Sequence, residues 1–282
     1  MYIDRLSICA VHLTFKAATD AALGTGTGFI VQAPNGPLLL TARHCVTGRF
    51  QAGSQPIHKS GAIPYSVLIR HHAGTSSLVG LLDEQPLYDE DKKPRWLHHP
   101  RYNCLTDIAA LPITIPKGAI TEPIELDDEE DYVLRYRVAP AVPAPRTLRL
   151  LPAEAVSVVG YPFGNSTAST LPIWATGFIA SEPGSNWEWG DMLIDCRARP
   201  GHSGSPVFAK RFGQLITGEG QHIEFEGVAD CFVGLYVGRI NEQSDFGVVY
   251  KPSTLRNLVN AGVPGHDCFW QKTANCRPLE LP

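Results

Sequence analysis

The sequence lacks several features that would place it in a well-known class. It has no apolar run near the ~20 residues that a membrane-spanning helix needs, and its net charge is only −4. We therefore expect neither membrane insertion nor a nucleic-acid partner, since no basic excess is present. The N-terminal segment carries Asp4 where a signal peptide would have a basic start, so it predicts a cytoplasmic protein.

Cysteine is sparse, and its seven positions are widely separated. They include no CxxC pair, which argues against a disulfide framework and against a zinc knuckle. We expect most of them to be buried free thiols, and whether Cys268 and Cys276 pair is left open. Two His-His doublets, at 71–72 and 98–99, are expected to have surface and turn roles because adjacent strand side chains point to opposite faces. The sequence therefore predicts no metal site and no cofactor.

Short apolar or alternating segments recur along the chain, separated by turn-forming residues, with 26 glycines and 23 prolines. Segments of this length and spacing are typical of β-sandwiches and barrels. The expected strands are 6–15, 26–32, 38–41, 66–71, 77–82, 108–113, 131–137, 155–160, 173–181, 192–196, 206–208, 232–237 and 246–250. One helix is expected at 253–261, with Ser253 as its N-cap and Gly262 at its end. The predicted fold class is all-β.

An acidic run at 127–131 and a proline-rich stretch after it interrupt the strand pattern. Such composition is typical of a solvated connector. The predicted organisation is an N-terminal β-domain at 1–120, a connector at 121–153, a C-terminal β-domain with the helix at 154–262, and a tail at 263–282. The tail could pack on the body of the protein or bind a regulatory protein.

The octapeptide GHSGSPVF, at 201–208, sets Ser203 between two glycines ahead of an apolar strand. By itself it predicts either an activated nucleophile or a tight turn. An activated serine needs a base and a group that orients the base. His44 follows an apolar strand and could accept a proton near neutral pH, while Asp107 precedes another strand and could accept the imidazole N–H. Each of these residues alone would also fit a capping role.

The three motifs occur in the order His, Asp, Ser, and together they resemble those of the chymotrypsin-like (trypsin-fold) serine peptidases. The matching segments are TARHC, HPRYN followed by TDIAALPI, and GHSGSP. The segments GTGFIV and GVVYKPSTLRNLV are more similar to the bacterial and intracellular branch, which includes the high-temperature-requirement proteases, than to digestive enzymes. The resemblance spans roughly residues 20–262 and implies two six-stranded antiparallel β-barrels, a cleft between them and a C-terminal helix.

On this resemblance, His44 would be the general base, Asp107 its orienting carboxylate and Ser203 the nucleophile. The backbone N–H groups of Gly201 and Ser203 would form the oxyanion hole. The implied reaction is hydrolysis of a polypeptide substrate through an acyl-enzyme, with no cofactor.

The specificity pocket would lie near Arg197, Ala198, Val237, Gly238 and Arg239. An arginine at its base would favour acidic side chains by charge pairing. If Arg197 instead turns outward, a small apolar slot is left, and the sequence does not choose between these alternatives.

Three residues depart from the family pattern. His202 stands where secreted members carry an aspartate that binds a newly cut amino terminus, so we expect that activation switch to be absent. Cys45 matches a family cysteine whose usual partner falls near Thr25, which fits a reducing compartment. Ser205 replaces a glycine. These departures leave room for a weakly active or inactive peptidase-fold binding protein.

An α/β-hydrolase esterase is a further alternative because GHSGS half-resembles the G-x-S-x-G motif. That class needs the order Ser, acid, His, with helices between its strands. Asp230 or Asp245 followed by His266 would supply the order. The shortage of helical segments argues against this class.

Overall fold

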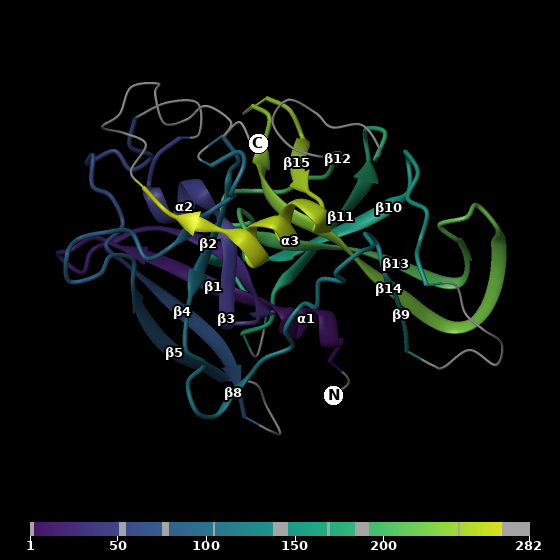
Figure 1. Ribbon diagram of the computed structural model, residues 1–282, viewed down its shortest axis with the longest axis horizontal. Coiled ribbons are helices and arrows are strands. Elements are labelled where there is room, and N and C mark those ends of the chain that lie inside the picture. The colour runs from purple at the N-terminus through teal and green to yellow at the C-terminus, as the bar shows by residue number, and fades with distance from the viewer. Residues whose placement is uncertain are drawn as a thin grey trace.

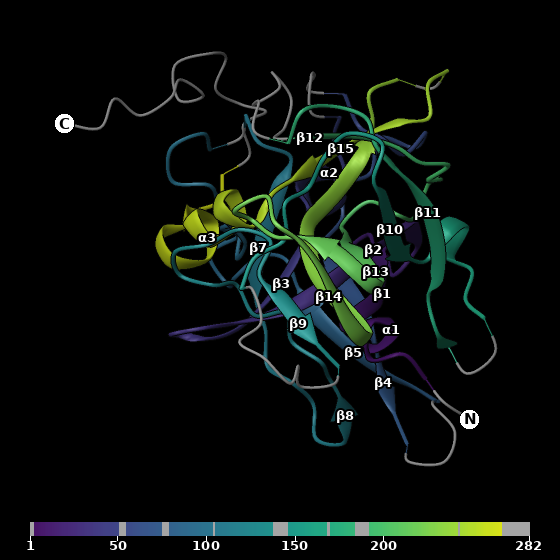
Figure 2. The same ribbon diagram turned by 90° about the vertical axis from the view of Figure 1, so that its right-hand side faces the viewer.

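Nearly all regular structure in the protein is β-strand, and the strands form two antiparallel sheets (Figures 1 and 2). The computed structural model describes residues 3–50, 55–74, 79–103, 105–137, 146–167, 170–183, 192–241 and 243–266. The all-β class with two sheets and a C-terminal helix is confirmed.

The first sheet has nine strands and carries most of the N-terminal half. Its strands are β1 (Ala10–Lys16), β2 (Ala22–Ala33), β3 (Gly36–Ala42), β4 (Ser66–Ala73), β5 (Val79–Pro86), β6 (Leu97–His98), β7 (Ile108–Pro112), β8 (Ala119–Ile120) and β16 (Val263–Pro264). They run in the order β16-β6-β7-β3-β2-β1-β4-β5, and β8 pairs with β4. The start of the predicted tail therefore returns to the first sheet, while 267–282, including Cys268 and Cys276, lie outside the described residues.

The second sheet has seven strands. They are β9 (Leu134–Tyr136), β10 (Ala155–Gly160), β11 (Ile173–Ile179), β12 (Met192–Asp195), β13 (Ser205–Ile216), β14 (His222–Arg239) and β15 (Phe246–Tyr250). Because β13 pairs with both β10 and β14, six of these strands form a closed ring of pairings, β10-β11-β12-β15-β14-β13. The remaining strand of this sheet, β9, pairs with β14 and comes from the predicted connector. Part of that segment is therefore built into the sheet.

The hairpin of β13 and β14 is much longer than the sequence predicts and extends away from the body of the protein (Figure 1). The expected strands covered only 206–208 and 232–237. Beyond them, the burial pattern alternates between partly buried and exposed positions, and polar residues are frequent. A two-sided, solvated hairpin has a weak apolar signal, which is why the pattern missed it.

The helices in the described residues are few and short, and two of them differ from expectation. The segment expected to be a strand from residue 6 begins instead as α1 (Arg5–Cys9), because the Asp4 carboxylate caps it by accepting the Leu6 N–H at 3.1 Å. The C-terminal helix α3 (Pro252–Ala261) starts at Pro252, and Ser253 Oγ donates to Asp131 at 2.9 Å instead of capping. The other two are α2 (Arg43–Thr47) and the 3₁₀ turn η1 (Pro162–Gly164).

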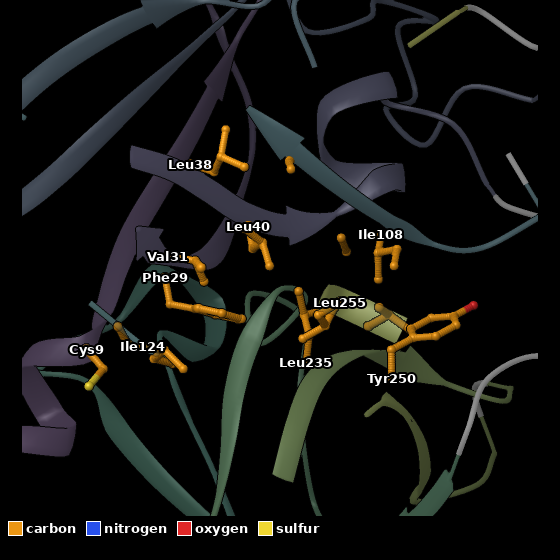
Figure 3. Packing of buried hydrophobic residues seen from close by; sticks show 14 of the residues in the cluster. Cys9, Phe29, Val31, Leu38, Leu40, Ile108, Ile124, Leu235, Tyr250 and Leu255 are labelled. Atoms are coloured by element: carbon orange, nitrogen blue, oxygen red, sulfur yellow. The ribbon is translucent and has the colours of Figure 1, made fainter. Parts of the chain in front are cut away.

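One apolar core joins the two sheets, and it fixes how the site described below is assembled (Figure 3). Phe29 and Leu40 of the first sheet pack in the same cluster as Leu235 and Tyr250 of the second. Leu255 of α3 completes this contact. Burial of apolar surface contributes roughly 25 cal/mol per Å², so this cluster stabilises the relative placement of the two sheets.

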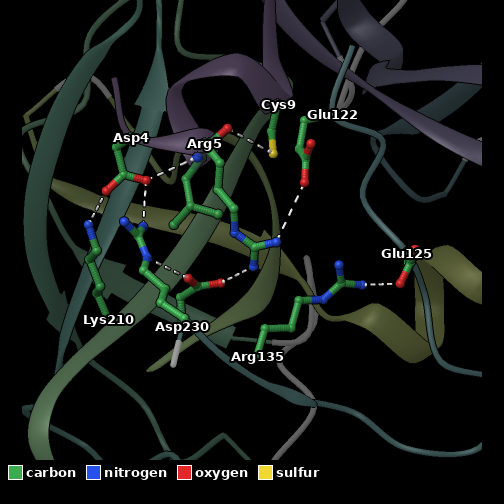
Figure 4. Close-up of polar contacts among 10 residues, drawn as sticks. Asp4, Arg5, Cys9, Glu122, Glu125, Arg135, Lys210 and Asp230 are labelled. Atoms are coloured by element: carbon green, nitrogen blue, oxygen red, sulfur yellow. Dashed lines mark hydrogen bonds and ion pairs between the residues drawn. The ribbon is translucent and has the colours of Figure 1, made fainter. Parts of the chain in front are cut away.

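A group of ion pairs ties α1 to the second sheet (Figure 4). Asp230 of β14 is almost fully buried, and its carboxylate binds Arg5 at 3.0 Å and Arg137 at 3.5 Å. Arg137 also binds Asp4 at 2.6 Å, and Lys210 pairs with the same aspartate. A buried carboxylate is stable only when its charge is met in this way, so these contacts anchor the N-terminal segment.

The His-His doublets are buried, which contradicts the expected surface and turn roles. His72 Nε2 lies 3.0 Å from the Ala10 carbonyl oxygen. His98 accepts from Trp96 Nε1 at 3.0 Å, and its Nδ1 lies 2.9 Å from Asn103 Oδ1. Burial lowers the pKa of His98 to about 3, so the ring is neutral near pH 7. All four imidazoles are polar members of the core, and those of His72 and His98 are held by hydrogen bonds that the sequence pattern does not reveal.

Candidate active site

His44 and Asp107 meet because the strands that precede and follow them are paired. His44 lies in α2, directly after β3, and Asp107 directly precedes β7, which pairs with β3. Asp107 Oδ2 lies 2.7 Å from His44 Nδ1, and Oδ1 accepts the His44 backbone N–H at 2.8 Å. An ionised carboxylate can only accept, so the proton of the neutral ring is on Nδ1 and Nε2 is left as the base.

The second sheet also holds the backbone of Asp107 in place. The Asp107 backbone N–H donates to the hydroxyl of Tyr250, at the end of β15, over 3.1 Å. Tyr250 is buried in the shared core (Figure 3). Sequence analysis did not identify Tyr250, because nothing in its local pattern distinguishes it from an ordinary core aromatic residue.

The electrostatic surroundings of His44 favour its charged form. Burial opposes charging of the imidazole, but the Asp107 carboxylate and the neighbouring Cys45 sulfur outweigh this effect and hold the pKa of His44 well above its usual value. A base with a raised pKa binds a proton strongly. The pair is therefore suited to remove a proton from a weakly acidic group that comes within reach of Nε2.

Ser203 lies in a loop of two consecutive tight turns. The His202 N–H donates to the Arg199 carbonyl at 3.0 Å, and the Ser205 N–H donates to the His202 carbonyl at 2.9 Å. Gly201 and Gly204 have φ of +97° and +89°, a region that favours glycine. A side chain at Gly201 would overlap the Tyr161 carbonyl oxygen, so the glycines of the motif are required by space as well as by backbone conformation.

Two backbone N–H groups of this loop take no part in its internal hydrogen bonds. The carbonyl of Pro200 accepts from Phe163 N–H at 2.6 Å, and the carbonyl of His202 accepts from the loop itself. The C=O and N–H of a trans peptide point in opposite directions, so the N–H groups of Gly201 and Ser203 face the other side. Within the described residues, neither of these two groups donates a hydrogen bond.

The serine loop lies beside the segment that carries His44. A methyl group added at Gly26 would be 3.3 Å from Cys45 Sγ and 3.4 Å from the Ser203 carbonyl oxygen. The structure therefore brings all three sequence-predicted side chains to one region. Within the described residues, no hydrogen bond joins Ser203 Oγ to the His44 imidazole. Among these three side chains, the hydrogen bond that the structure contains is the one between His44 and Asp107.

The residues expected around a specificity pocket differ widely in exposure. The Arg197 side chain is 85% exposed, and its Nε lies 3.8 Å from Asp245 Oδ2. Ala198 is fully buried and Val237 is 4% exposed, while Gly238 and Arg239 are partly buried. Arg197 is thus directed outward, which corresponds to the second of the two alternatives left open by the sequence.

The residues that an α/β-hydrolase would need are engaged elsewhere, and its helix-separated sheet is absent from the described residues. Asp230 belongs to the ion pairs with Arg5 and Arg137, and Asp245 binds Arg199 at 3.1 Å. The Asn103 amide lies 2.8 Å from His266 Nε2. This alternative is wrong, because the acid and the histidine that would follow Ser203 have other partners.

His202 and Ser205, two of the departures from the family motif, are both buried. His202 Nδ1 accepts the Arg199 N–H at 3.0 Å, and burial lowers the pKa of the ring to about 4. A neutral imidazole in this position braces the first turn of the loop. It offers no negative charge to an amino terminus.

The described part of the chain contains no group of three or more His, Cys, Asp or Glu side chains placed to hold a metal ion. Among the same residues, no helix has both the length and the apolar character needed to cross a bilayer. Four cysteines in this part, Cys9, Cys45, Cys196 and Cys231, are free thiols.

Comparison with solved structures returns bacterial-type serine proteases. The Rv3671c protease from M. tuberculosis in its active form is 16% identical, with a TM-score of 0.45 over 93% of this chain and 84% of that chain. The thermostable serine protease AL20 from an extremophilic microorganism is 14% identical, with a TM-score of 0.45 over 90% and 96%. The HtrA-type protease AlgW with a tripeptide is 13% identical, with a TM-score of 0.46 over 90% and 61%.

No curated protein matches the chain. The family model described as "Trypsin-like peptidase domain" matches residues 26–216, which include His44, Asp107 and Ser203. Since this match covers well over half of the chain, the protein belongs to the trypsin-like peptidase family of serine hydrolases.

Proposed function

We propose that the protein is an endopeptidase in which Ser203, His44 and Asp107 act as a catalytic triad. The observation that carries this proposal is the double contact of the Asp107 carboxylate with the backbone and the imidazole of His44. It fixes the ring orientation and the tautomer, which is the role of the carboxylate in such a triad. Hydrogen bonds between nucleophile and base often form only when substrate is bound, and we expect that behaviour for Ser203.

In the proposed reaction, Ser203 Oγ forms a bond to the scissile carbonyl carbon while its proton passes to His44 Nε2. The negative charge that develops on the carbonyl oxygen is met by the N–H groups of Gly201 and Ser203, which are directed away from the hydrogen bonds of the loop. His44 then gives the proton to the leaving amine as the C–N bond breaks. Water then gives a proton to His44 and bonds to the acyl carbon. The bond between that carbon and Ser203 Oγ breaks, and His44 returns the proton to Oγ.

The exposure of Arg197 supports a small apolar pocket rather than one that selects acidic side chains. A guanidinium that is mostly in water and beside Asp245 is poorly placed to pair with a substrate carboxylate inside a pocket. The buried Ala198 and Val237 offer only apolar groups there. We infer a preference for small aliphatic residues on the N-terminal side of the cleaved bond.

A fluorophosphonate probe tests the proposal, because it forms a covalent bond only with an activated serine. We expect wild-type protein to be labelled at Ser203, Ser203→Ala to be unlabelled, and Ser205→Ala, which removes the neighbouring buried hydroxyl, to be labelled still. Equal labelling of Ser203→Ala would overturn the assignment. An unlabelled wild type that still binds peptides would instead support the binding-protein alternative.

A further inference from the structure

Thr27 of β2 makes more contacts with the serine loop than its place in the sequence suggests. It belongs to the first sheet and is fully buried. Its backbone N–H donates to the Ser203 carbonyl at 2.9 Å, and its hydroxyl donates to the Gly201 carbonyl at 2.7 Å. The same hydroxyl accepts the Tyr161 N–H at 3.0 Å. One residue of the first sheet therefore binds two carbonyls of the loop that carries the nucleophile.

These contacts complete an alternating set along the loop. The carbonyls of Pro200 and His202 are bound by Phe163 and by the loop's own turn, and those of Gly201 and Ser203 are bound by Thr27. Each carbonyl fixes the plane of its peptide group. With all four planes fixed, the unused N–H groups of Gly201 and Ser203 are held in the directions opposite to the carbonyls of Pro200 and His202.

The hydroxyl contact is the part of this set that depends on a side chain. Glycine at 201 has little conformational preference of its own, so the rotation of its peptide planes must be set by its partners. Without the hydroxyl, the buried Gly201 carbonyl would lose its hydrogen-bond donor. An unpaired buried carbonyl is costly enough to drive local rotation toward another donor. The Gly201 N–H lies on the preceding peptide group, whose Pro200 carbonyl is held by the Phe163 N–H. Because the Thr27 hydroxyl also accepts the Tyr161 N–H, its loss would loosen the segment that supplies Phe163 as well. Both peptide groups that meet at Gly201 could then rotate, and the Gly201 N–H would turn away from the substrate oxygen.

We propose that the Thr27 hydroxyl is a positioning group that sets the direction of the Gly201 N–H. It does so by joining the Gly201 carbonyl to the Tyr161–Phe163 segment, whose Phe163 N–H holds the Pro200 carbonyl. This inference rests on the proposed peptidase function and adds a residue to it. Thr27 touches neither the substrate nor the reacting atoms, and it acts through the two peptide groups that meet at Gly201. Its place in the first sheet also makes the orientation of the loop depend on how the two sheets are docked.

Two substitutions at this position and one control separate positioning from packing. Thr27→Val keeps the shape and loses the hydroxyl, whereas Thr27→Ser keeps the hydroxyl. Thr217→Val is the matched control, because Thr217 is also buried and its hydroxyl accepts the Gln221 N–H at 3.1 Å in a hairpin far from the loop. Measurements are kcat and KM for a peptide substrate, affinity for a peptide boronic acid that forms a tetrahedral adduct, and the thermal midpoint Tm.

For Thr27→Val we expect kcat to fall by about 10²-fold, the effect of losing one oxyanion donor, with KM changed by less than about twofold. Affinity for the boronic acid should fall in parallel with kcat, while Thr27→Ser should restore both. Thr217→Val should lower Tm without lowering kcat. The pH dependence of Thr27→Val should keep the wild-type midpoint, because the contact between His44 and Asp107 is untouched.

The positioning role is overturned if folded Thr27→Val keeps the wild-type kcat, or if Thr27→Ser loses as much activity as Thr27→Val. If Thr27→Val does not fold, Thr27→Cys replaces it: its thiol is a weak donor, and a kcat equal to that of Thr27→Ser would overturn the role. Failure of the peptidase function itself gives a different pattern, because the wild-type protein would then be inert to the fluorophosphonate probe.

Discussion

The Asp107 carboxylate binds His44 at two points. Its Oδ1 accepts the backbone N–H of His44 at 2.8 Å, and its Oδ2 lies 2.7 Å from Nδ1 of the ring. The backbone contact anchors the start of α2 to the start of β7, and the imidazole contact sets the tautomer. Since Asp107 is only 5% exposed, water competes little for either oxygen. The base is thus fixed in place by the same group that tunes its proton affinity.

Asp107→Asn should lower kcat about 10⁴-fold, because an amide can donate to Nδ1 and so favour the wrong tautomer. The acidic limb of the pH profile should also move. In the wild-type protein, the raised pKa of His44 means that kcat/KM falls as pH drops through a value above the usual 6.5. Without the carboxylate charge, burial remains and lowers the pKa, so the limb should shift to lower pH. An unchanged limb, measured from pH 5 to 10, would contradict the assignment of His44 as the base.

Asp230→Ala should destabilise the fold without changing kcat. This buried carboxylate binds Arg5 and Arg137, and its removal takes an ion-pair partner from both guanidinium groups. Breaking a buried ion pair costs about 3 kcal/mol or more of unfolding free energy. Urea denaturation measures this loss. The control is Glu125→Ala, which removes an exposed ion pair with Arg135 and should change stability by less than about 1 kcal/mol. An equal effect of the two substitutions would contradict the anchoring role of Asp230.

Stability should decrease as pH falls from about 6.5 toward 4. Burial lowers the pKa of His12 to about 4, with the charge of Arg70 adding to the effect, so the ring stays neutral in the fold while the unfolded chain binds a proton. Each such histidine contributes a slope of up to about 1.4 kcal/mol per pH unit to the unfolding free energy. Replacing His12 by Phe should remove about that much slope between pH 6 and 4.5. A His12→Phe variant that keeps the wild-type slope would contradict the role of burial.

Arg197→Ala should change the preference between acidic and small aliphatic side chains by less than about threefold, since the guanidinium is 85% exposed. Digestion of a peptide library, read by mass spectrometry, measures this preference. If the wild-type protein favours acidic residues and the variant loses that preference, Arg197 faces the substrate when substrate is bound. The inferred apolar pocket would then be wrong.

Much of the architecture follows from local patterns. Alternating and short apolar segments predicted an all-β protein with one C-terminal helix, and the structure has that helix as α3. The patterns failed where local and tertiary signals compete. Asp4 capped a helix in a segment that reads as a strand, and the solvated hairpin of β13 and β14 gave too little apolar signal to be extended to its full length.

The sequence by itself determined which residue types could carry chemistry, because the histidine, aspartate and serine motifs combine side-chain identity with turn and strand context over short stretches. Only the tertiary structure decided their contacts. The hydrogen bond from Thr27 to Gly201 joins residues 174 positions apart, and that from Asp107 to Tyr250 joins residues 143 positions apart. Contacts of this kind depend on how two sheets dock through a shared core, and a local pattern holds no information about docking. The same reason explains why the outward direction of Arg197 and the burial of the paired histidines emerged only from the fold.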